Sequence, residues 1–216
     1  MKIAVLGTGT VGNTIGSRLI GLGHEVKMGS RIRGNEKATE WTSGNGARAT
    51  EGTFADAAAF GELIFNCTKG IATLEVLKQA GAQNLEGKIV IDVSNGLDAS
   101  DGGFPILSPC NTDSLGEQIQ REFPGAKVVK TLNTMWCGIM MNPRMLNDTH
   151  QVYMSGNNAD AKNTVREMLY SFGWMDEEIM DLGDISTSRG TEMILPLWIR
   201  IYSATKNGAF NLKIVK

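Results

Sequence analysis

The sequence predicts an α/β protein built on a doubly wound parallel sheet, followed by a small C-terminal addition of strand, helix, strand and helix. Two observations lead to this prediction. Short apolar runs of strand length alternate with helical segments through residues 1–150, and this alternation is typical of a parallel sheet with helices on both faces. The first apolar run also leads directly into a glycine-rich turn and a helix.

Residues 1–33 contain the element that starts such a sheet. Residues 3–6 form a short apolar run, as in a strand that is buried on both faces. The segment 7–12 follows with the pattern G-x-G-x-x-G, and residues 11, 15, 19 and 22 are apolar at helical spacing. A second strand is expected around residues 26–28. This context of strand, glycine turn, helix and strand is that of the Rossmann dinucleotide-binding motif.

Each glycine of the motif has a physical role. Gly7 allows a tight turn out of the strand, Gly9 allows a pyrophosphate to approach the backbone, and Gly12 allows the helix to pack close to the strand. The free N–H groups at the start of the helix favour a phosphate there. We therefore expect the pyrophosphate of a dinucleotide to lie on the residues of this loop, which are Gly7, Thr8, Gly9, Thr10, Val11 and Gly12.

The end of the second strand indicates which dinucleotide binds. NAD-binding proteins place an Asp or Glu there, where the carboxylate binds the ribose 2′-hydroxyl. This chain has Ser30, Arg31 and Arg33 in that region, and Glu25 lies at the opposite end of the strand. A hydroxyl and guanidinium groups suit a 2′-phosphate, so the sequence favours NADP. The alternative is that both arginines are only solvated loop charges.

Composition sets broad limits on function. A net charge of −2 without a basic block gives no electrostatic support for nucleic-acid binding. The apolar runs are too short to span a membrane, and the N-terminus enters the first strand without room for a signal peptide. Three widely spaced cysteines form no zinc pattern and no disulfide framework. We expect a cytoplasmic protein with one compact α/β unit.

The remaining elements of residues 1–150 follow from apolar runs and caps. Thr53 is expected to cap a helix that has Asp56 in its first turn. Helices are expected near 35–41, 53–59, 72–80 and 115–123, and strands near 48–51, 63–67, 88–93 and 127–132. Residues 97–112 are expected to form a long functional loop.

In such a sheet the ligand lies at the carboxyl ends of the strands. Besides the ends of the first two strands, this rule selects Cys67 to Gly70, Ser94 to Gly96 with Asn95, and Asn133 to Cys137. Cys67 is interpreted as a small strand-end residue rather than a nucleophile, because no histidine is placed by sequence to activate it.

Residues 151–216 are expected to form an α/β extension that packs on the first part. A strand should start at Gln151, an amphipathic helix should run over 158–172, and a short strand should cover 179–182. A final helix over 188–207 is apolar nearly all round, so we expect it to be buried. Pro196 predicts a kink or a break in that helix. The helix could also wall a ring-binding pocket or form a dimer interface.

Five stretches together resemble one family. GTGTVG, HEVKMGSR, KIVIDVSNGLD, VVKTLNTMWCGIMMNP and VYMSGNNADAK with its following LYSFGW are similar to the NADP oxidoreductases that depend on coenzyme F420, a deazaflavin. The NADPH-binding domains of the STEAP-type metalloreductases are also similar. The last two stretches are the more specific ones.

The resemblance implies a homodimer in which a hydride passes between nicotinamide C4 and deazaflavin C5. It implies that the motif residues bind the pyrophosphate, and that Ser30, Arg31 and Arg33 bind the 2′-phosphate. Residues expected along the ribose, the nicotinamide and the second ring are Thr68, Lys69, Asn133 and Met135. Archaeal members tend to have His in place of Asn133 and Ile-Pro in place of Thr68-Lys69.

Three functions remain open from sequence alone. The first is a reductase whose acceptor is a deazaflavin or a flavin. The second is a reductase of a small carbonyl or imine, for which Lys69, Lys130 or Tyr153 could donate a proton. The third is a non-catalytic NADP sensor.

Overall fold

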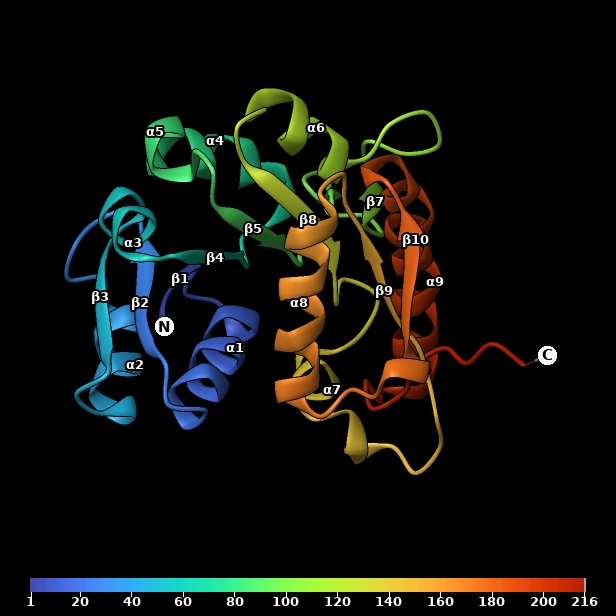
Figure 1. Ribbon diagram of the computed structural model, residues 1–216. Coiled ribbons are helices and arrows are strands. Elements are labelled where there is room, and N and C mark those ends of the chain that lie inside the picture. The colour runs from blue at the N-terminus through green and yellow to red at the C-terminus, as the bar shows by residue number, and fades with distance from the viewer. Residues whose placement is uncertain (216) are drawn as a thin grey trace.

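The computed structural model describes residues 1–215 and contains one eight-stranded sheet with helices on both faces (Figure 1). The strand order is β10-β9-β8-β5-β4-β1-β2-β3, and neighbouring strands are parallel except for the antiparallel pair β8 and β9. The doubly wound parallel fold predicted from sequence is therefore confirmed. The strands of this sheet are β1 (Lys2–Leu6), β2 (Glu25–Ser30), β3 (Ala49–Thr53), β4 (Leu63–Asn66), β5 (Ile89–Asp92), β8 (Lys127–Thr131), β9 (Val152–Ser155) and β10 (Ile179–Gly183).

The helices lie in two layers (Figure 1). One layer contains α1 (Thr10–Gly21), α2 (Glu36–Asn45), α7 (Cys137–Met141) and α8 (Ala159–Phe172). The other contains α3 (Phe54–Phe60), α4 (Thr73–Ala80), α5 (Ala82–Leu85) and α6 (Leu115–Glu122). The long helix α9 (Ser188–Thr205) contacts α6 and β9. Short 3-10 helices cover Gly70–Ala72, Pro143–Met145, Asp176–Glu178 and Ile185–Thr187.

Alternate residues of the central strands belong to two separate cores. On β1, Ile3 and Val5 pack with the layer of α1 and α8, whereas Ala4 and Leu6 pack with the layer of α3 and α4. This follows from the two-residue period of a strand, and it explains why the run is apolar without alternation. Each fully buried aliphatic side chain stabilises the fold by about 1.5–3 kcal/mol.

The C-terminal segment joins the same sheet. Its strands β9 and β10 pair with each other and extend the sheet beyond β8. Phe172 of α8 packs against Phe65 of β4, with ring centroids 6.4 Å apart, in the core formed with α1. The first turns of α9 lie near the carboxyl ends of β5 and β8, because Glu192 pairs with Lys130 of β8, which also pairs with Asp92 at the end of β5.

The structure corrects the expectation that the final helix is buried. Met193, Leu197 and Tyr202 of α9 are 41%, 55% and 45% exposed. The residues of α9 are apolar nearly all round, as expected, but its fully buried side chains lie only in its first turns. Later side chains are at most half-buried, such as Trp198, which stacks on Phe210 with ring centroids 5.3 Å apart. The helix also continues through Pro196 without a break.

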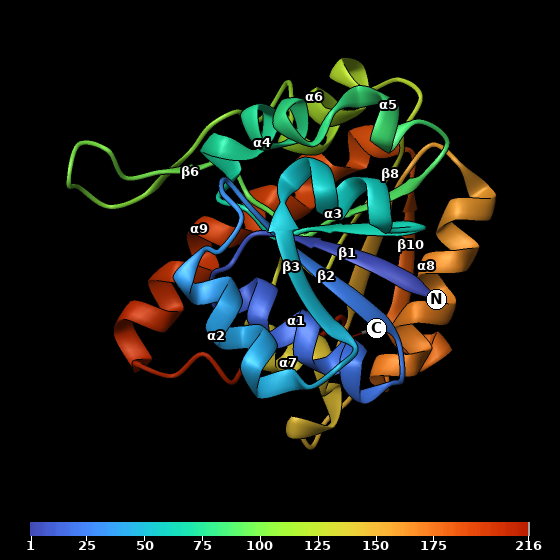
Figure 2. The same ribbon diagram turned by 90° about the vertical axis from the view of Figure 1, so that its left-hand side faces the viewer.

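The region expected to be a long loop contains a small hairpin. Strands β6 (Leu97–Asp98) and β7 (Ile106–Leu107) pair antiparallel and form a second sheet. Figure 2 shows the loop between them projecting away from the body of the molecule, on the side of α9. The strands have only two residues each, so no periodic pattern could predict them.

Candidate cofactor and acceptor site

The glycine loop has the geometry that a phosphate requires. A Cβ on Gly12 would lie 2.1 Å from the Gly7 carbonyl oxygen, so this position needs a glycine for packing of α1 against β1. Gly7 has a φ of +114°, and a Cβ there would lie 2.8 Å from the Cys67 carbonyl oxygen. Gly9 is the N-cap of α1, makes no side-chain cap, and has nothing within 4 Å of its Cβ position. The space at Gly9 and the free amides of α1 therefore fit a pyrophosphate.

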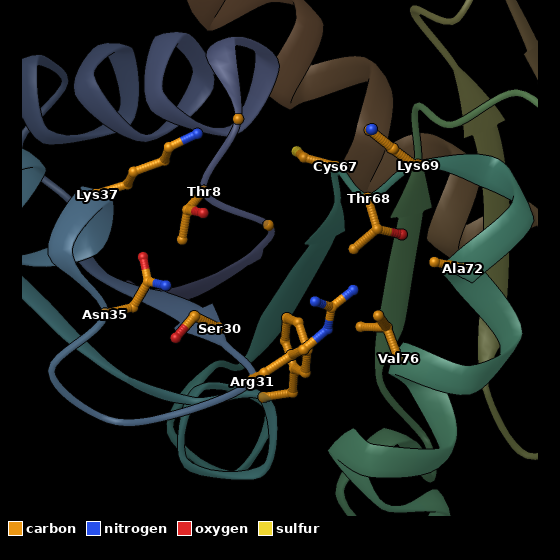
Figure 3. Close-up of a pocket in the computed structure, with 14 residues that line it drawn as sticks. Thr8, Ser30, Arg31, Asn35, Lys37, Cys67, Thr68, Lys69, Ala72 and Val76 are labelled. Atoms are coloured by element: carbon orange, nitrogen blue, oxygen red, sulfur yellow. The ribbon is translucent and has the colours of Figure 1, made fainter. Parts of the chain in front are cut away.

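A cavity of about 400 Å³ continues from this loop along the ends of β1, β2 and β4 (Figure 3). Among residues 1–215, its lining includes three cationic side chains, Arg31, Lys37 and Lys69, and no carboxylate. NADP carries a pyrophosphate and a 2′-phosphate, and the charge of the cavity matches these anions. The other lining residues are Gly7, Thr8, Gly9, Gly29, Ser30, Asn35, Phe54, Cys67, Thr68, Ala72 and Val76.

The residues expected at the 2′-phosphate are placed differently from one another. The Arg31 guanidinium points across the cavity toward Thr68 and Val76 (Figure 3). Ser30 lies in the lining and donates its hydroxyl to the Ile32 carbonyl oxygen at 2.6 Å. Arg33 does not belong to the lining, because its guanidinium binds the Asp56 carboxylate at 2.9 Å.

Two further polar residues of the cavity were missed from sequence. Asn35 caps α2 by accepting a hydrogen bond from Ala38 N at 3.3 Å, and Lys37 follows in the first turn of that helix. Figure 3 shows both side chains on the wall opposite Thr68. The position of the expected helix at 35–41, directly after the Ser-Arg strand end, was the signal that could have identified Lys37.

Cys67 and Thr68 stand at the end of β4 with little chemical reactivity. Burial raises the pKa of the Cys67 thiol above its ordinary value, so the thiolate is not formed near neutral pH. The Thr68 hydroxyl donates to Asn66 Oδ1 at 2.7 Å and lies 2.9 Å from the Thr73 hydroxyl. These two residues therefore shape the cavity wall rather than supply a nucleophile or a proton.

A second hollow, of about 270 Å³, lies past the start of α1. Asn95 and Asn133 close it with a reciprocal pair of hydrogen bonds, from Asn133 Nδ2 to Asn95 Oδ1 and from Asn95 Nδ2 to the Asn133 carbonyl oxygen, both 2.9 Å long. Its other lining residues are Thr10, Val11, Val93, Met135, Trp136, Cys137, Met140, Leu195 and Trp198. The fold thus brings Asn95, Asn133 and Met135 together with Thr10 and Val11.

A third hollow, of about 550 Å³, connects the first two through shared residues. Thr68 and Lys69 belong to it and to the first cavity, whereas Val11, Asn95 and Leu195 belong to it and to the second hollow. The expected ligand positions therefore form one continuous path along the strand ends. Of the proton donors considered from sequence, Lys69 lies on this path, and Lys130 and Tyr153 line none of the three spaces.

Fold and site together define a Rossmann-type dinucleotide-binding protein. The family model described as "NADP oxidoreductase coenzyme F420-dependent" matches residues 2–96. A solved structure from Arthrobacter sp. FB24, described as a proposed F420-dependent NADP reductase, has 48% identity and a TM-score of 0.93, with 100% of both chains covered. The chain belongs to the family of coenzyme F420-dependent NADP oxidoreductases.

Two more distant proteins are similar to this chain over part of their own length. Metalloreductase STEAP3 of Rattus norvegicus is 30% identical over 206 residues, which are 91% of this chain and 38% of the length of STEAP3. An imine reductase from Myxococcus stipitatus has a TM-score of 0.63 at 14% identity, covering 94% of this chain and 61% of its own, which shows a shared fold. Among residues 1–215, no helix is long and apolar enough to cross a membrane.

Proposed function

We propose that the protein transfers a hydride between NADPH and a deazaflavin or flavin acceptor by direct stacking of the two rings. The observation that carries this proposal is the hollow beside Asn133, which is walled by flat or flexible apolar side chains. These are Met135, Trp136, Met140, Leu195 and Trp198. Hydride transfer between two rings needs the reacting atoms about 3–3.5 Å apart and water excluded. Flat apolar walls favour close stacking of the rings and keep water out.

The geometry of the three hollows supports a position for each part of the cofactor. Gly9 and the amides of α1 would hold the pyrophosphate, and Ser30 and Arg31, together with Lys37, would hold the 2′-phosphate. The residues proposed for the ribose and nicotinamide side are Cys67, Thr68, Lys69, Asn95, Asn133 and Met135. When bound, the cofactor would supply the hydride donor or acceptor carbon, and the chain would orient and shield it.

The second and third hollows, which together form the proposed acceptor path, contain few groups for acid–base chemistry. Of the described residues that line the second and third hollows, only Lys69, Asp98 and Cys137 can titrate. Hydrogen bonds from Ser100 lower the pKa of Asp98, so this carboxyl is ionised and cannot donate a proton near neutral pH. Reduction of a carbonyl or imine usually needs a proton donor. Lys69 lines the third hollow but not the second, where Cys137 is the only titratable group among the described lining residues. The second hollow therefore favours an acceptor ring that takes a hydride alone.

An acceptor screen tests the proposal. Purified protein and NADPH are mixed separately with coenzyme F420, FMN, FAD and a panel of cyclic imines, and NADPH oxidation is followed by absorbance. We expect turnover with F420 or a flavin and none with the imines. Turnover only with imines would support the small-substrate alternative, and NADPH binding without any turnover would support a sensor.

The exposed side of α9 supports a homodimer. A groove of about 720 Å³ lies between α9 and the β6–β7 hairpin, and it is lined mainly by apolar residues. Ile106 and Leu197 are 61% and 55% exposed there. A second copy of the chain, with the same apolar surface, is the occupant we propose. All three cysteines are free thiols, which fits the cytoplasmic location expected from sequence.

A further inference from the structure

Lys130, Asp92 and Glu192 form a buried cluster of charged side chains. The cluster lies next to Ser94 and Asn95, where the nicotinamide is proposed to bind. The side chain of Lys130, on β8, is 0% exposed, and its ammonium lies 2.7 Å from Asp92 Oδ2, 2.8 Å from Glu192 Oε1 and 2.6 Å from the Ser94 carbonyl oxygen. All three donors of the ammonium therefore have a partner. Burial opposes the charge, but the Asp92 and Glu192 carboxylates outweigh it and raise the pKa of Lys130, so the ammonium is retained.

Stability alone does not explain this cluster. Removing three charged groups from water is costly, and apolar side chains of similar volume usually fill such a space at least as well. The distinctive property of the cluster is geometric, since charged hydrogen bonds hold their partners in one arrangement.

The cluster joins segments that are far apart in the sequence. Asp92 Oδ1 accepts hydrogen bonds from Asn66 Nδ2 at 2.7 Å and from the Ser94 hydroxyl at 2.6 Å, which ties the end of β4 to the end of β5. Glu192 accepts the backbone amides of Leu115 and Gly116 at 2.9 and 3.0 Å, at the start of α6. The ends of three strands are thereby connected to α6 and α9.

Glu192 is the link between this cluster and the acceptor side. Leu195 follows Glu192 by one turn of α9 and lines both hollows of the acceptor path, and Trp198 follows by a further turn and lines the second hollow. Beyond Glu192, none of the α9 side chains is fully buried, although Trp198 stacks on Phe210 with ring centroids 5.3 Å apart. Glu192 is therefore the last α9 side chain held by charged hydrogen bonds before Leu195 and Trp198 reach the second hollow.

We propose that Glu192 is a positioning residue that holds α9 as the acceptor-side wall at the correct distance from the nicotinamide end. This inference rests on the proposed ring-to-ring transfer. Hydride transfer is sensitive to small displacements of the reacting rings, and an error of 1 Å can reduce the rate by about 100-fold.

The test is Glu192→Gln, which keeps the shape of the side chain and removes its charge. The matched control is Glu178→Gln, because Glu178 is also 0% exposed, pairs with Arg144, and accepts the Met175 amide at 3.0 Å, but lines none of the hollows. NADPH affinity is measured by its fluorescence, and hydride transfer to F420 by single-turnover stopped flow. Hydrogen exchange of residues 193–199 is measured without any acceptor.

We expect Glu192→Gln to lower the transfer rate at least about tenfold, to leave the NADPH dissociation constant within about twofold, and to speed exchange in α9. Glu178→Gln should lower the unfolding temperature without these effects. Unchanged exchange in α9, or an unchanged transfer rate, overturns the inference. If wild-type protein transfers no hydride to F420 or to a flavin, the proposed acceptor is wrong, and the exchange experiment alone decides whether Glu192 holds α9.

Discussion

Gly9 has nothing within 4 Å of the place where a Cβ would be, whereas a Cβ on Gly12 would collide with the Gly7 carbonyl oxygen. The backbone of Gly9, with φ −82° and ψ 179°, is also one that alanine adopts easily. The fold therefore does not require a glycine at position 9, which supports the proposal that a bound pyrophosphate does.

We expect Gly9→Ala to leave the unfolding temperature unchanged and to weaken NADPH binding by about tenfold or more, which is about 1.4 kcal/mol. Fluorescence titration and thermal unfolding measure the two effects. Gly21→Ala, at the other end of α1 and equally open, is the control and should bind NADPH normally. A Gly9→Ala protein with wild-type affinity would show that the pyrophosphate does not lie on this loop.

Arg31, Lys37 and Arg33 lie near the proposed 2′-phosphate position, and their replacement by alanine should change NADPH affinity by different amounts. Arg31→Ala should cost about 1.5–3 kcal/mol of NADPH affinity, as expected for a hydrogen bond to a charged group, and leave NADH affinity unchanged. Lys37→Ala should act in the same direction. Arg33→Ala should have little effect on binding, because its guanidinium is on Asp56 and 73% exposed. A large loss with Arg33→Ala would mean that Arg33 leaves Asp56 for the phosphate.

At the scale of elements, the Thr53 cap predicted from sequence is confirmed for α3, and the structure shows that Asp56 completes it as a capping box. The Thr53 hydroxyl accepts the Asp56 amide at 3.1 Å, and the Asp56 carboxylate accepts the Thr53 amide at 2.9 Å. The Thr53 amide and the Arg33 guanidinium lower the pKa of Asp56 to about 2 from 3.8. The ionised form therefore stabilises the fold above about pH 4, and this contribution is lost as the pH falls toward 2.

Asp56→Asn should lower the free energy of unfolding by about 0.5–1 kcal/mol at pH 7, a small value because the side chain is partly exposed and screened. Urea unfolding at several pH values measures it. The difference between wild type and variant should shrink as the pH decreases from 4. A difference that is constant down to pH 3 would exclude a role for the charge of Asp56.

The helix α9 shows what a pattern along one element leaves undecided. Its apolar residues predicted burial, but burial depends on neighbouring segments, and these bury only side chains of the first turns completely. Met193 and Leu197 face the groove beside the hairpin and are exposed. The direction of β9, antiparallel to β8, was equally undetermined, because strand pairing depends on the neighbouring strand and not on the strand itself.

At the scale of the whole molecule, the exposed face of α9 predicts assembly. Leu197→Asp should convert a dimer into a monomer in sedimentation velocity, because a charge would be buried without a partner at the centre of the interface. Val215→Asp is the control, since Val215 is 82% exposed and lies outside the groove. A wild-type protein that sediments as a monomer at micromolar concentration would contradict the proposed homodimer.

The sequence by itself determined the parallel sheet, the glycine loop and the absence of an acidic residue at the end of β2. The patterns that predict these features lie within short stretches of the chain, so they can be recognised from the order of the residues alone. Only the tertiary structure decided that Arg33 pairs with Asp56, that Lys37 lines the same cavity as Arg31, and that Lys130 pairs with Glu192 of α9. Each of these depends on which distant segments the sheet brings together, and no local pattern specifies the distance between two side chains on different elements.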